Sequence, residues 1–294
     1  MVKIEIKGGL GNQLFQYAVA RRLSLNTNSN LILDISNYRG PNSDHSRCFH
    51  LNKFNISGEV TFDTSCIEKS KKRLIENTGS YSPLLGLRVF NIYIENHPFK
   101  LDDRFFDLPG NTYLKGYWQS HKYFADISKT IKKDLIHRTP LKRRNNQLYR
   151  SILESNSVSL HIRRGDYEDL GKQLSVDYYV RAISKIQSMV EKPHFFIFSD
   201  DKKYVRNCFL ERINKLFPRI EYTIVDGNTS DPTKDLRLMR ECDHNIIANS
   251  TFSWWGAWLN EKDDNIVLAP GTWHSHCIDD IDVIPSSWKS ISVS

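Results

Sequence analysis

The sequence contains few cysteines and no long apolar run. Its five cysteines are an odd number, lie far apart and form no Cys-x-x-Cys pair, which argues against a disulfide framework or a structural zinc site. No segment approaches the ~18–20 apolar residues of a membrane span, and no N-terminal apolar stretch has the length of a signal peptide. These absences predict a globular, cytoplasmic protein.

Internal repeats and low-complexity tracts are also absent, and acidic residues are the minority among the charges. Lys and Arg number 41 against 34 Asp and Glu, which gives a net charge of +7. A positive protein attracts anionic partners. Because the basic residues are scattered and no ribonucleoprotein motif is present, nucleic acid is not an expected partner. A small anionic ligand, or peripheral contact with the anionic inner membrane, accounts for the excess equally well.

The second half of the chain alternates strand and helix patterns. Short apolar runs predict strands at 158–162, 195–198, 222–225, 245–248 and 266–269. Helical spacing of apolar residues predicts helices at 176–190, 202–217, 234–242 and 253–260. Alternating strands and helices joined by short connections predict a parallel sheet covered by helices on both faces.

The first half opens with a clear strand–helix unit and then becomes less regular. Strands are expected at 2–6, 31–34 and 113–116, and helices at 12–25 and 123–135. Residues 35–110 contain many turn-forming residues and read as irregular. The polar, basic segment 136–150 contains a proline and is the predicted linker. The chain is therefore divided into domains at 1–145 and 146–294.

Residues 161–167 read His-Ile-Arg-Arg-Gly-Asp-Tyr and directly follow a predicted buried strand. In open α/β sheets, ligands bind beyond the carboxyl ends of the strands. Arginine suits a phosphate there because its planar fork donates two parallel hydrogen bonds to an oxyanion. Alternatively, Arg163 and Arg164 form structural salt bridges with nearby acids such as Asp166.

Gly-Gly-Leu-Gly-Asn-Gln at 8–13 lies between the first strand and the first helix. It is neither a dinucleotide fingerprint nor a Walker loop, because Leu14 replaces the last glycine and no Gly-Lys-Ser/Thr follows. Glycines let a backbone approach a ligand closely and leave amide donors free at a helix start. A tight turn is the alternative, but the two amide side chains that follow favour binding.

Two further motifs follow predicted strands. Ser199-Asp200-Asp201 offers carboxylates that accept hydrogen bonds from a guanine or a ribose, or simply caps the next helix. Asn249-Ser250-Thr251-Phe252-Ser253 offers hydroxyls and free amides to a phosphate at a helix start, with a plain capping turn as the alternative. Trp254 and Trp255 are expected in the core and between domains. Together, these strand ends predict a nucleotide-diphosphate site.

The motifs at 8–16, 161–167, 198–201 and 246–257 closely resemble those of the α-1,2-fucosyltransferases of glycosyltransferase family 11. Their order and spacing match, and they span almost the whole chain. The resemblance implies a GT-B-like α/β fold with two Rossmann-type domains, an N-terminal acceptor side and a C-terminal nucleotide-sugar domain. It also implies GDP-fucose as donor, a galactose-terminated glycan as acceptor, inversion at the anomeric carbon and no metal requirement.

The same resemblance implies roles for individual residues. Arg163, Asn12 and Asp166 form the expected catalytic set, although no general base is evident. The expected donor-binding residues are His161, Arg163, Arg164, Asp200, Asp201, Asn249, Ser250, Thr251, Phe252 and Ser253. The expected acceptor and sugar side consists of Gly9, Gly11, Asn12 and Gln13. Acceptor selectivity is expected in residues 35–110.

Two other functions remain open from the sequence alone. One is a GT-B transferase that uses a different nucleotide-sugar donor, and the other is a non-catalytic glycan-binding protein. Comparing the binding of GDP with that of UDP distinguishes a transferase with another donor from a fucosyltransferase. Release of GDP distinguishes a fucosyltransferase from a non-catalytic glycan-binding protein. The acceptor is either a free or a lipid-linked glycan, for example an O-antigen precursor.

Overall fold

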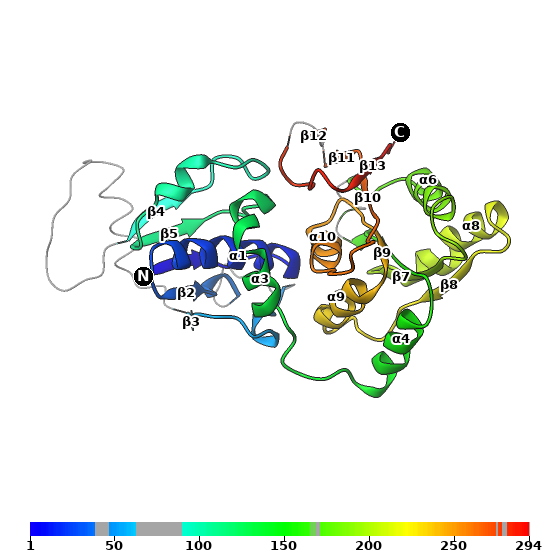
Figure 1. Ribbon diagram of the computed structural model, residues 1–294, viewed down its shortest axis with the longest axis horizontal. Helices are drawn as coiled ribbons and strands as arrows, with labels where there is room; N and C mark the ends of the chain where they lie inside the picture. Colours follow the sequence, from blue (N-terminus) through cyan, green and yellow to red (C-terminus); the bar gives the residue numbers. More distant parts are fainter. Residues whose placement is uncertain are drawn as a thin grey trace, which may run out of the picture.

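The computed structural model describes residues 1–38, 47–62, 90–165, 167, 171–274, 276–277 and 281–293. Each half of the chain forms one parallel sheet with helices packed on it, and the two units lie side by side (Figure 1). Helix α1 (Leu10–Asn26) and helix α10 (Thr251–Trp258) meet where the two units join. The predicted α/β class with two Rossmann-type halves is confirmed.

The N-terminal sheet has the order β3-β2-β1-β5-β4, and all its pairs are parallel. Its strands are β1 (Val2–Glu5), β2 (Leu31–Asp34), β3 (Glu59–Thr61), β4 (Asn91–Ile94) and β5 (Thr112–Lys115). The central strand β1 is almost wholly buried, which explains its apolar side chains. Strand β1 ends in a turn that leads directly into α1.

The C-terminal sheet has the order β13-β10-β9-β6-β7-β8 and is also wholly parallel. Its strands are β6 (Ser157–Ile162), β7 (His194–Ser199), β8 (Glu221–Ile224), β9 (His244–Ile246), β10 (Val267–Pro270) and β13 (Lys289–Ile291). A short antiparallel pair, β11 (Thr272–Trp273) and β12 (His276–Cys277), follows β10. All five predicted strands of this half are therefore confirmed within one to two residues.

Helices cover both sheets. The other helices of the C-terminal half are α4 (Arg143–Leu153), α6 (Val176–Gln187), α7 (Lys202–Tyr204), η6 (Val205–Phe209), α8 (Leu210–Leu216) and α9 (Pro232–Glu241). The N-terminal half adds η1 (Ser36–Tyr38), η2 (Leu51–Lys53), η3 (Asp103–Asp107), η4 (His121–Tyr123), η5 (Ala125–Ile127) and α3 (Ser128–Asp134). The single helix predicted at 202–217 is interrupted by the π-helical turn η6.

The linker prediction for 136–150 is wrong for its second part, where α4 begins at Arg143. The side chains of Leu148, Tyr149 and Ile152 pack against the C-terminal half, while the basic residues face solvent. This amphipathic helix reads as a polar linker because its apolar face is narrow. The irregular reading of 35–110 is likewise wrong where β3 and β4 form, and 39–46 and 63–89 lie outside the described residues.

Aromatic packing joins the two halves. Phe15 of α1 lies 4.5 Å from Trp254 and 5.1 Å from Trp255 of α10, between ring centroids. Phe124 stacks on Trp255 at 5.6 Å. These rings are fully buried and belong to one hydrophobic core that crosses the junction. The expectation that both tryptophans pack in the core and between domains is confirmed.

Candidate functional site

A cavity of about 780 Å³ lies between the two halves, where the carboxyl ends of both sheets face each other. The turn before α1 forms one wall, and residues that follow β6, β7, β8 and β9 form the other. Three helices, α1, α9 and α10, begin at this cavity. Helix N-termini carry unsatisfied amide donors and partial positive charge, so the cavity suits an anion.

The glycine turn brings α1 to the cavity and then close to α10. Gly8 has a φ of +76°, a left-handed conformation that glycine adopts without strain. Gly9 is the N-cap of α1 and has no side chain to cap it, and Gly9, Leu10 and Gly11 line the cavity. A Cβ atom on Gly11 would lie 2.5 Å from the Oγ1 of Thr251. Glycine is therefore required for this approach between the two halves.

The two amide side chains after the glycines have different surroundings. Asn12 lines the cavity, and its Oδ1 accepts hydrogen bonds from Gln119 at 3.1 Å and from Thr251 at 3.2 Å. Gln13 is fully buried instead. Its Nε2 donates to the carbonyls of Gly8 and Cys48, and its Oε1 accepts from the His50 amide. Gln13 thus holds the cavity wall in place rather than lining it.

Arg163 follows β6 and lines the cavity. Its Nη1 lies 2.6 Å from Oδ2 of Asp200, and its guanidinium lies over the ring of Tyr167 at 5.2 Å. The Arg163 side chain is 19% exposed. Asp200 also accepts the backbone N–H of Arg164 at 2.9 Å. The ion pair therefore sets the orientation of Arg163 toward the cavity.

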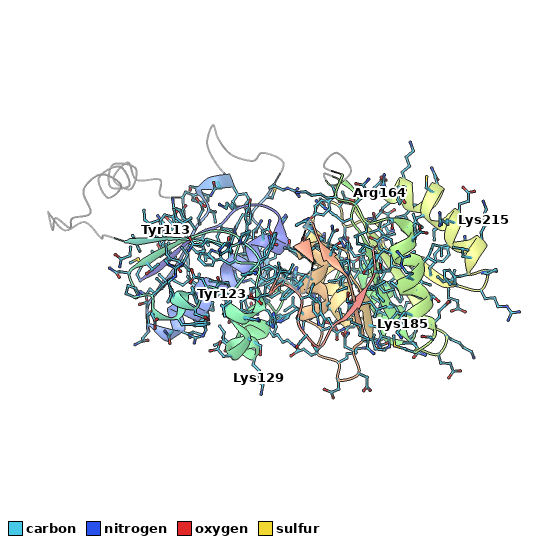
Figure 2. All side chains as sticks on the ribbon, turned by 90° about the horizontal axis from the view of Figure 1, so that it is seen from above. Tyr113, Tyr123, Lys129, Arg164, Lys185 and Lys215 are labelled. Atoms are coloured by element: carbon cyan, nitrogen blue, oxygen red, sulfur yellow. The ribbon has the colours of Figure 1, made fainter. Side chains whose placement is uncertain are left out.

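Arg164 extends in another direction, although it is adjacent in sequence. Its Nε lies 3.3 Å from Oδ2 of Asp201, and its guanidinium lies 3.7 Å from the ring centre of Tyr204. Neither Arg164 nor Asp201 lines the cavity. Figure 2 labels Arg164 in the C-terminal half, well away from Lys215 at the far end of that half. Among the described residues, Asp201 is an ionic partner of Arg164, and the expected partner Asp166 lies outside them.

His161 lines the cavity and is buried, with 4% of its surface exposed. Burial, with the charges of Arg163 and Lys202, lowers the pKa of His161 to about 3. The imidazole is therefore neutral at physiological pH. Its ring lies 5.5 Å from that of Phe252, which also lines the cavity.

Acid is expected to destabilise the fold partly through His161. The imidazole of His161 takes up a proton near pH 6.5 in the unfolded chain but only near pH 3 in the folded chain. The free energy of unfolding should fall with decreasing pH in this window, by up to about 1.4 kcal/mol per unit. Urea unfolding between pH 6.5 and 4 measures this slope, which should be shallower in His161→Gln. Equal slopes in the two proteins would show that His161 does not contribute.

The segment that leads into α10 contains both residues that line the cavity and residues that are buried behind it. Ser250, Thr251 and Phe252 line the cavity, and the Ser250 side chain caps the helix by accepting from the Phe252 amide. Ser253 is buried and bonded to the backbone of Ala248 and Ser250. Asn249 is buried and donates to the carbonyl of Lys172. Three of the five predicted residues thus reach the cavity.

Several cavity residues were not predicted from the sequence. They include Arg47, His50, Lys202, Asn228 and Asp235. Lys202 donates to the carbonyl of Ser199 at 3.0 Å, and Asn228 donates to Asp235 at 2.7 Å. Burial raises the pKa of Asp235. The polar run that follows β8 is the strand-end signal that could have located Asn228.

The described residues contain no group of three or more His, Cys, Asp or Glu side chains that could hold a metal ion. The cavity instead combines Arg47, Arg163 and Lys202 with the helix starts. This arrangement can bind a diphosphate and stabilise negative charge that develops on it.

Within the described part of the chain, no helix is both long and apolar enough to span a bilayer.

Comparison with known proteins identifies the family. The model for "Glycosyl transferase family 11" matches residues 1–290. The chain belongs to glycosyl transferase family 11. It is therefore a glycosyltransferase, and the cavity between its two sheets is the candidate active site.

Relatives in this family include two proteins of Escherichia coli. The O-antigen biosynthesis glycosyltransferase WbnK is 34% identical over 91% of this chain and 93% of its own length. An alpha-1,2-colitosyltransferase is 31% identical over 99% of both chains. Among solved structures, the α-1,6-fucosyltransferase NodZ of Bradyrhizobium, soaked with GDP-fucose, has a TM-score of 0.52 at 16% identity. That match covers 88% of this chain and 92% of NodZ, and it confirms the GT-B-like fold.

Proposed function

We propose that this family 11 enzyme is an inverting α-1,2-fucosyltransferase. It would transfer L-fucose from GDP-β-L-fucose to the 2-hydroxyl of a terminal galactose. Family membership over the whole chain and the "alpha-1,2" linkage named for a full-length relative support this proposal. The observation that carries it is Arg163, held in a cavity where α1 and α10 both begin.

In this proposal the diphosphate lies against Arg163 and the first turn of α10. Negative charge develops on the β-phosphate as the bond to fucose breaks, so donors aimed there lower the barrier. Ser250 and Thr251 offer a hydroxyl and helix amides on the same side. A guanidinium carries five N–H donors, so the pair with Asp200 and a bond to phosphate can coexist. Arg164 and Asp201 support this loop from outside the cavity.

The acceptor enters from the N-terminal side, past Asn12 and the glycine turn. Its hydroxyl attacks the fucose on the face opposite the departing phosphate, through an oxocarbenium-like transition state. That geometry inverts the anomeric centre. Asp166 stays a prediction as a member of the catalytic set, because it lies outside the described residues. A net charge of +7 would favour a lipid-linked acceptor at an anionic membrane.

A donor and acceptor screen tests the proposal. GDP release is measured with GDP-fucose against a panel of terminal β-galactosides, and the linkage of the product is determined by NMR. Transfer to O2 of galactose with an α-linkage is the expected result. GDP-colitose is the second donor to include, because the full-length relative is named a colitosyltransferase. Faster transfer from GDP-colitose or from a UDP-sugar would reject the fucosyl assignment.

Transfer is expected to need no divalent metal. Cationic side chains and helix N-termini already supply the positive charge that a metal would otherwise bring to the diphosphate. Initial rates of GDP release should therefore be the same with about 5 mM EDTA, an excess over trace metal, as without chelator. Loss of activity in EDTA that magnesium or manganese restores would contradict this prediction.

A further inference from the structure

Glu95 follows β4 and holds a turn at the end of the neighbouring strand β5. Its Oε2 accepts the backbone N–H of Tyr117 at 2.7 Å, and its Oε1 accepts that of Trp118 at 2.6 Å. One carboxylate thus binds two consecutive amides with both of its oxygens. Hydrogen bonds to a charged acceptor are about twice as strong as neutral ones.

The turn that Glu95 holds has an unfavourable backbone conformation. Trp118 has a φ of +60°, in the left-handed region that bulky residues rarely adopt. Its ring is fully buried and stacks on that of Tyr93 at 6.1 Å. Strained residues of this kind persist only where their surroundings hold them. The carboxylate of Glu95 and the packing of the Trp118 ring provide that restraint.

The next residue carries the geometry of the turn to the cavity. The backbone N–H of Gln119 donates to the carbonyl of Pro98 at 3.1 Å, and its Nε2 donates to Oδ1 of Asn12 at 3.1 Å. The same oxygen accepts from Thr251 of the C-terminal half. Because both donors bind Oδ1, the amide of Asn12 is oriented with its NH₂ group left for other contacts. Asn12 lines the cavity.

Gln119 itself is 8% exposed, and its buried Oε1 has no hydrogen-bond partner among the described residues. Gln119 does not line the cavity, so it can act on the acceptor only through Asn12. Glu95, the turn and the Gln119–Asn12 pair therefore form one continuous connection from the end of β4 to the cavity.

We propose that Glu95 is a positioning residue for the acceptor: it holds the Tyr117–Gln119 turn so that Gln119 orients the Asn12 amide toward the acceptor glycan. This rests on the proposed function. Glu95 does not line the cavity, so it acts through the turn rather than on the substrate. Burial raises the pKa of Glu95 to about 7, against the opposing effects of the two amides and of Lys7.

Glu95→Gln is the first test. An amide can accept from one of the two backbone N–H groups but turns its own donor toward the other. Loss of one buried hydrogen bond with an unsatisfied partner should reduce kcat/KM for the acceptor about tenfold or more. The dissociation constant for GDP, measured by calorimetry, should change less than about twofold, because the diphosphate side is untouched. Unchanged acceptor kinetics, or an equal loss of GDP affinity, would overturn the proposal.

Three further variants separate positioning from general stability. Glu95→Asp should recover part of the acceptor kcat/KM. Gln119→Leu leaves the Glu95 bonds intact and should raise the acceptor KM by itself, which keeps the test valid if Glu95→Gln does not fold. Asp243→Asn is the matched control, because Asp243 accepts the backbone N–H of Ser157 at 2.8 Å in the C-terminal half and does not line the cavity. A loss in Asp243→Asn equal to that in Glu95→Gln would indicate a merely structural role.

The outcome is separable from that of the proposed function. If the wild-type enzyme uses GDP-colitose rather than GDP-fucose, the same comparison is made with that donor. The donor assignment then fails while the effect of Glu95→Gln on the acceptor still stands. If fucose transfer is confirmed but Gln119→Leu leaves the acceptor KM unchanged, only the positioning proposal fails.

Discussion

Replacing Arg163 with alanine is expected to abolish sugar transfer while the protein stays folded. The guanidinium is the cationic side chain at the end of β6 that the Asp200 ion pair orients into the cavity. Removing a donor aimed at developing negative charge typically costs a factor of about 10²–10³ in kcat, and arginines in phosphoryl transfer reach about 10³–10⁵. We expect a loss of about 10³ or more, measured as GDP release at saturating donor and acceptor.

Arg163→Lys distinguishes charge from geometry. Lysine keeps the positive charge but lacks the planar fork that can bind Asp200 and an oxyanion together. We expect this variant also to be inactive, within about tenfold of alanine. Circular dichroism and thermal unfolding should show a folded protein in both cases. Near-normal turnover in Arg163→Lys would mean that charge alone is sufficient.

Two other arginines provide controls for this experiment. Arg164→Ala removes a side chain that pairs with Asp201 and covers Tyr204 outside the cavity. The free energy of unfolding should therefore fall, while kcat should change little. Arg212→Ala removes an ion pair with Asp177 in which both side chains are about half exposed, so it should change neither the free energy of unfolding nor kcat. If Arg164→Ala inactivates the enzyme as strongly as Arg163→Ala, the division of roles between the two arginines is wrong.

Gly11→Ala is expected to have the second largest effect, a loss of about 100-fold or more in kcat/KM. A methyl group at position 11 would lie 2.5 Å from the carbonyl carbon of Thr251 and 2.6 Å from the amide of Phe252. These are backbone atoms at the start of α10, so they cannot give way as a flexible side chain would. The N-terminal wall must move instead. A displacement of about 1 Å between reacting groups can cost about 10²-fold in rate.

Gly9→Ala is the matched variant for Gly11→Ala. Its Cβ would lie 3.6 Å from Nη1 of Arg47, an ordinary contact with the end of a flexible side chain. Its φ of −73° suits any residue. We expect a much smaller loss, within about fivefold, because the approach of α1 to α10 is preserved. Steady-state kinetics and melting temperatures of both variants test this, and equal losses would indicate that any added methyl group in the turn is harmful.

The positions of the strands in the C-terminal half could be predicted because the sheet is parallel and buried on both faces. Such strands are short apolar runs, and β6 and β7 show them clearly. The N-terminal half was harder to read, because β3 and β4 are short and partly exposed. Helix α4 was missed for a related reason, since only its narrow face towards α9 is apolar.

The strand-end rule located the candidate site but not each residue within it. Arg163 and Arg164 are adjacent and chemically alike, yet one lines the cavity and the other covers Tyr204. Asn12 and Gln13 differ in the same way. Consecutive residues point in different directions, and the side that faces the ligand depends on which elements pack around them. No pattern along the chain records that packing.

The amino-acid sequence by itself determined the family, the α/β class and the strand ends that line the cavity, because these depend on local patterns and on motifs in a fixed order. Only the tertiary structure decided how the two halves meet. The bond between Asn12 and Thr251 joins residues 239 positions apart. Likewise, the restraint of the Tyr117–Trp118 turn by Glu95 depends on two neighbouring strands. Such contacts arise when separate elements pack together, and local periodicity carries no information about them.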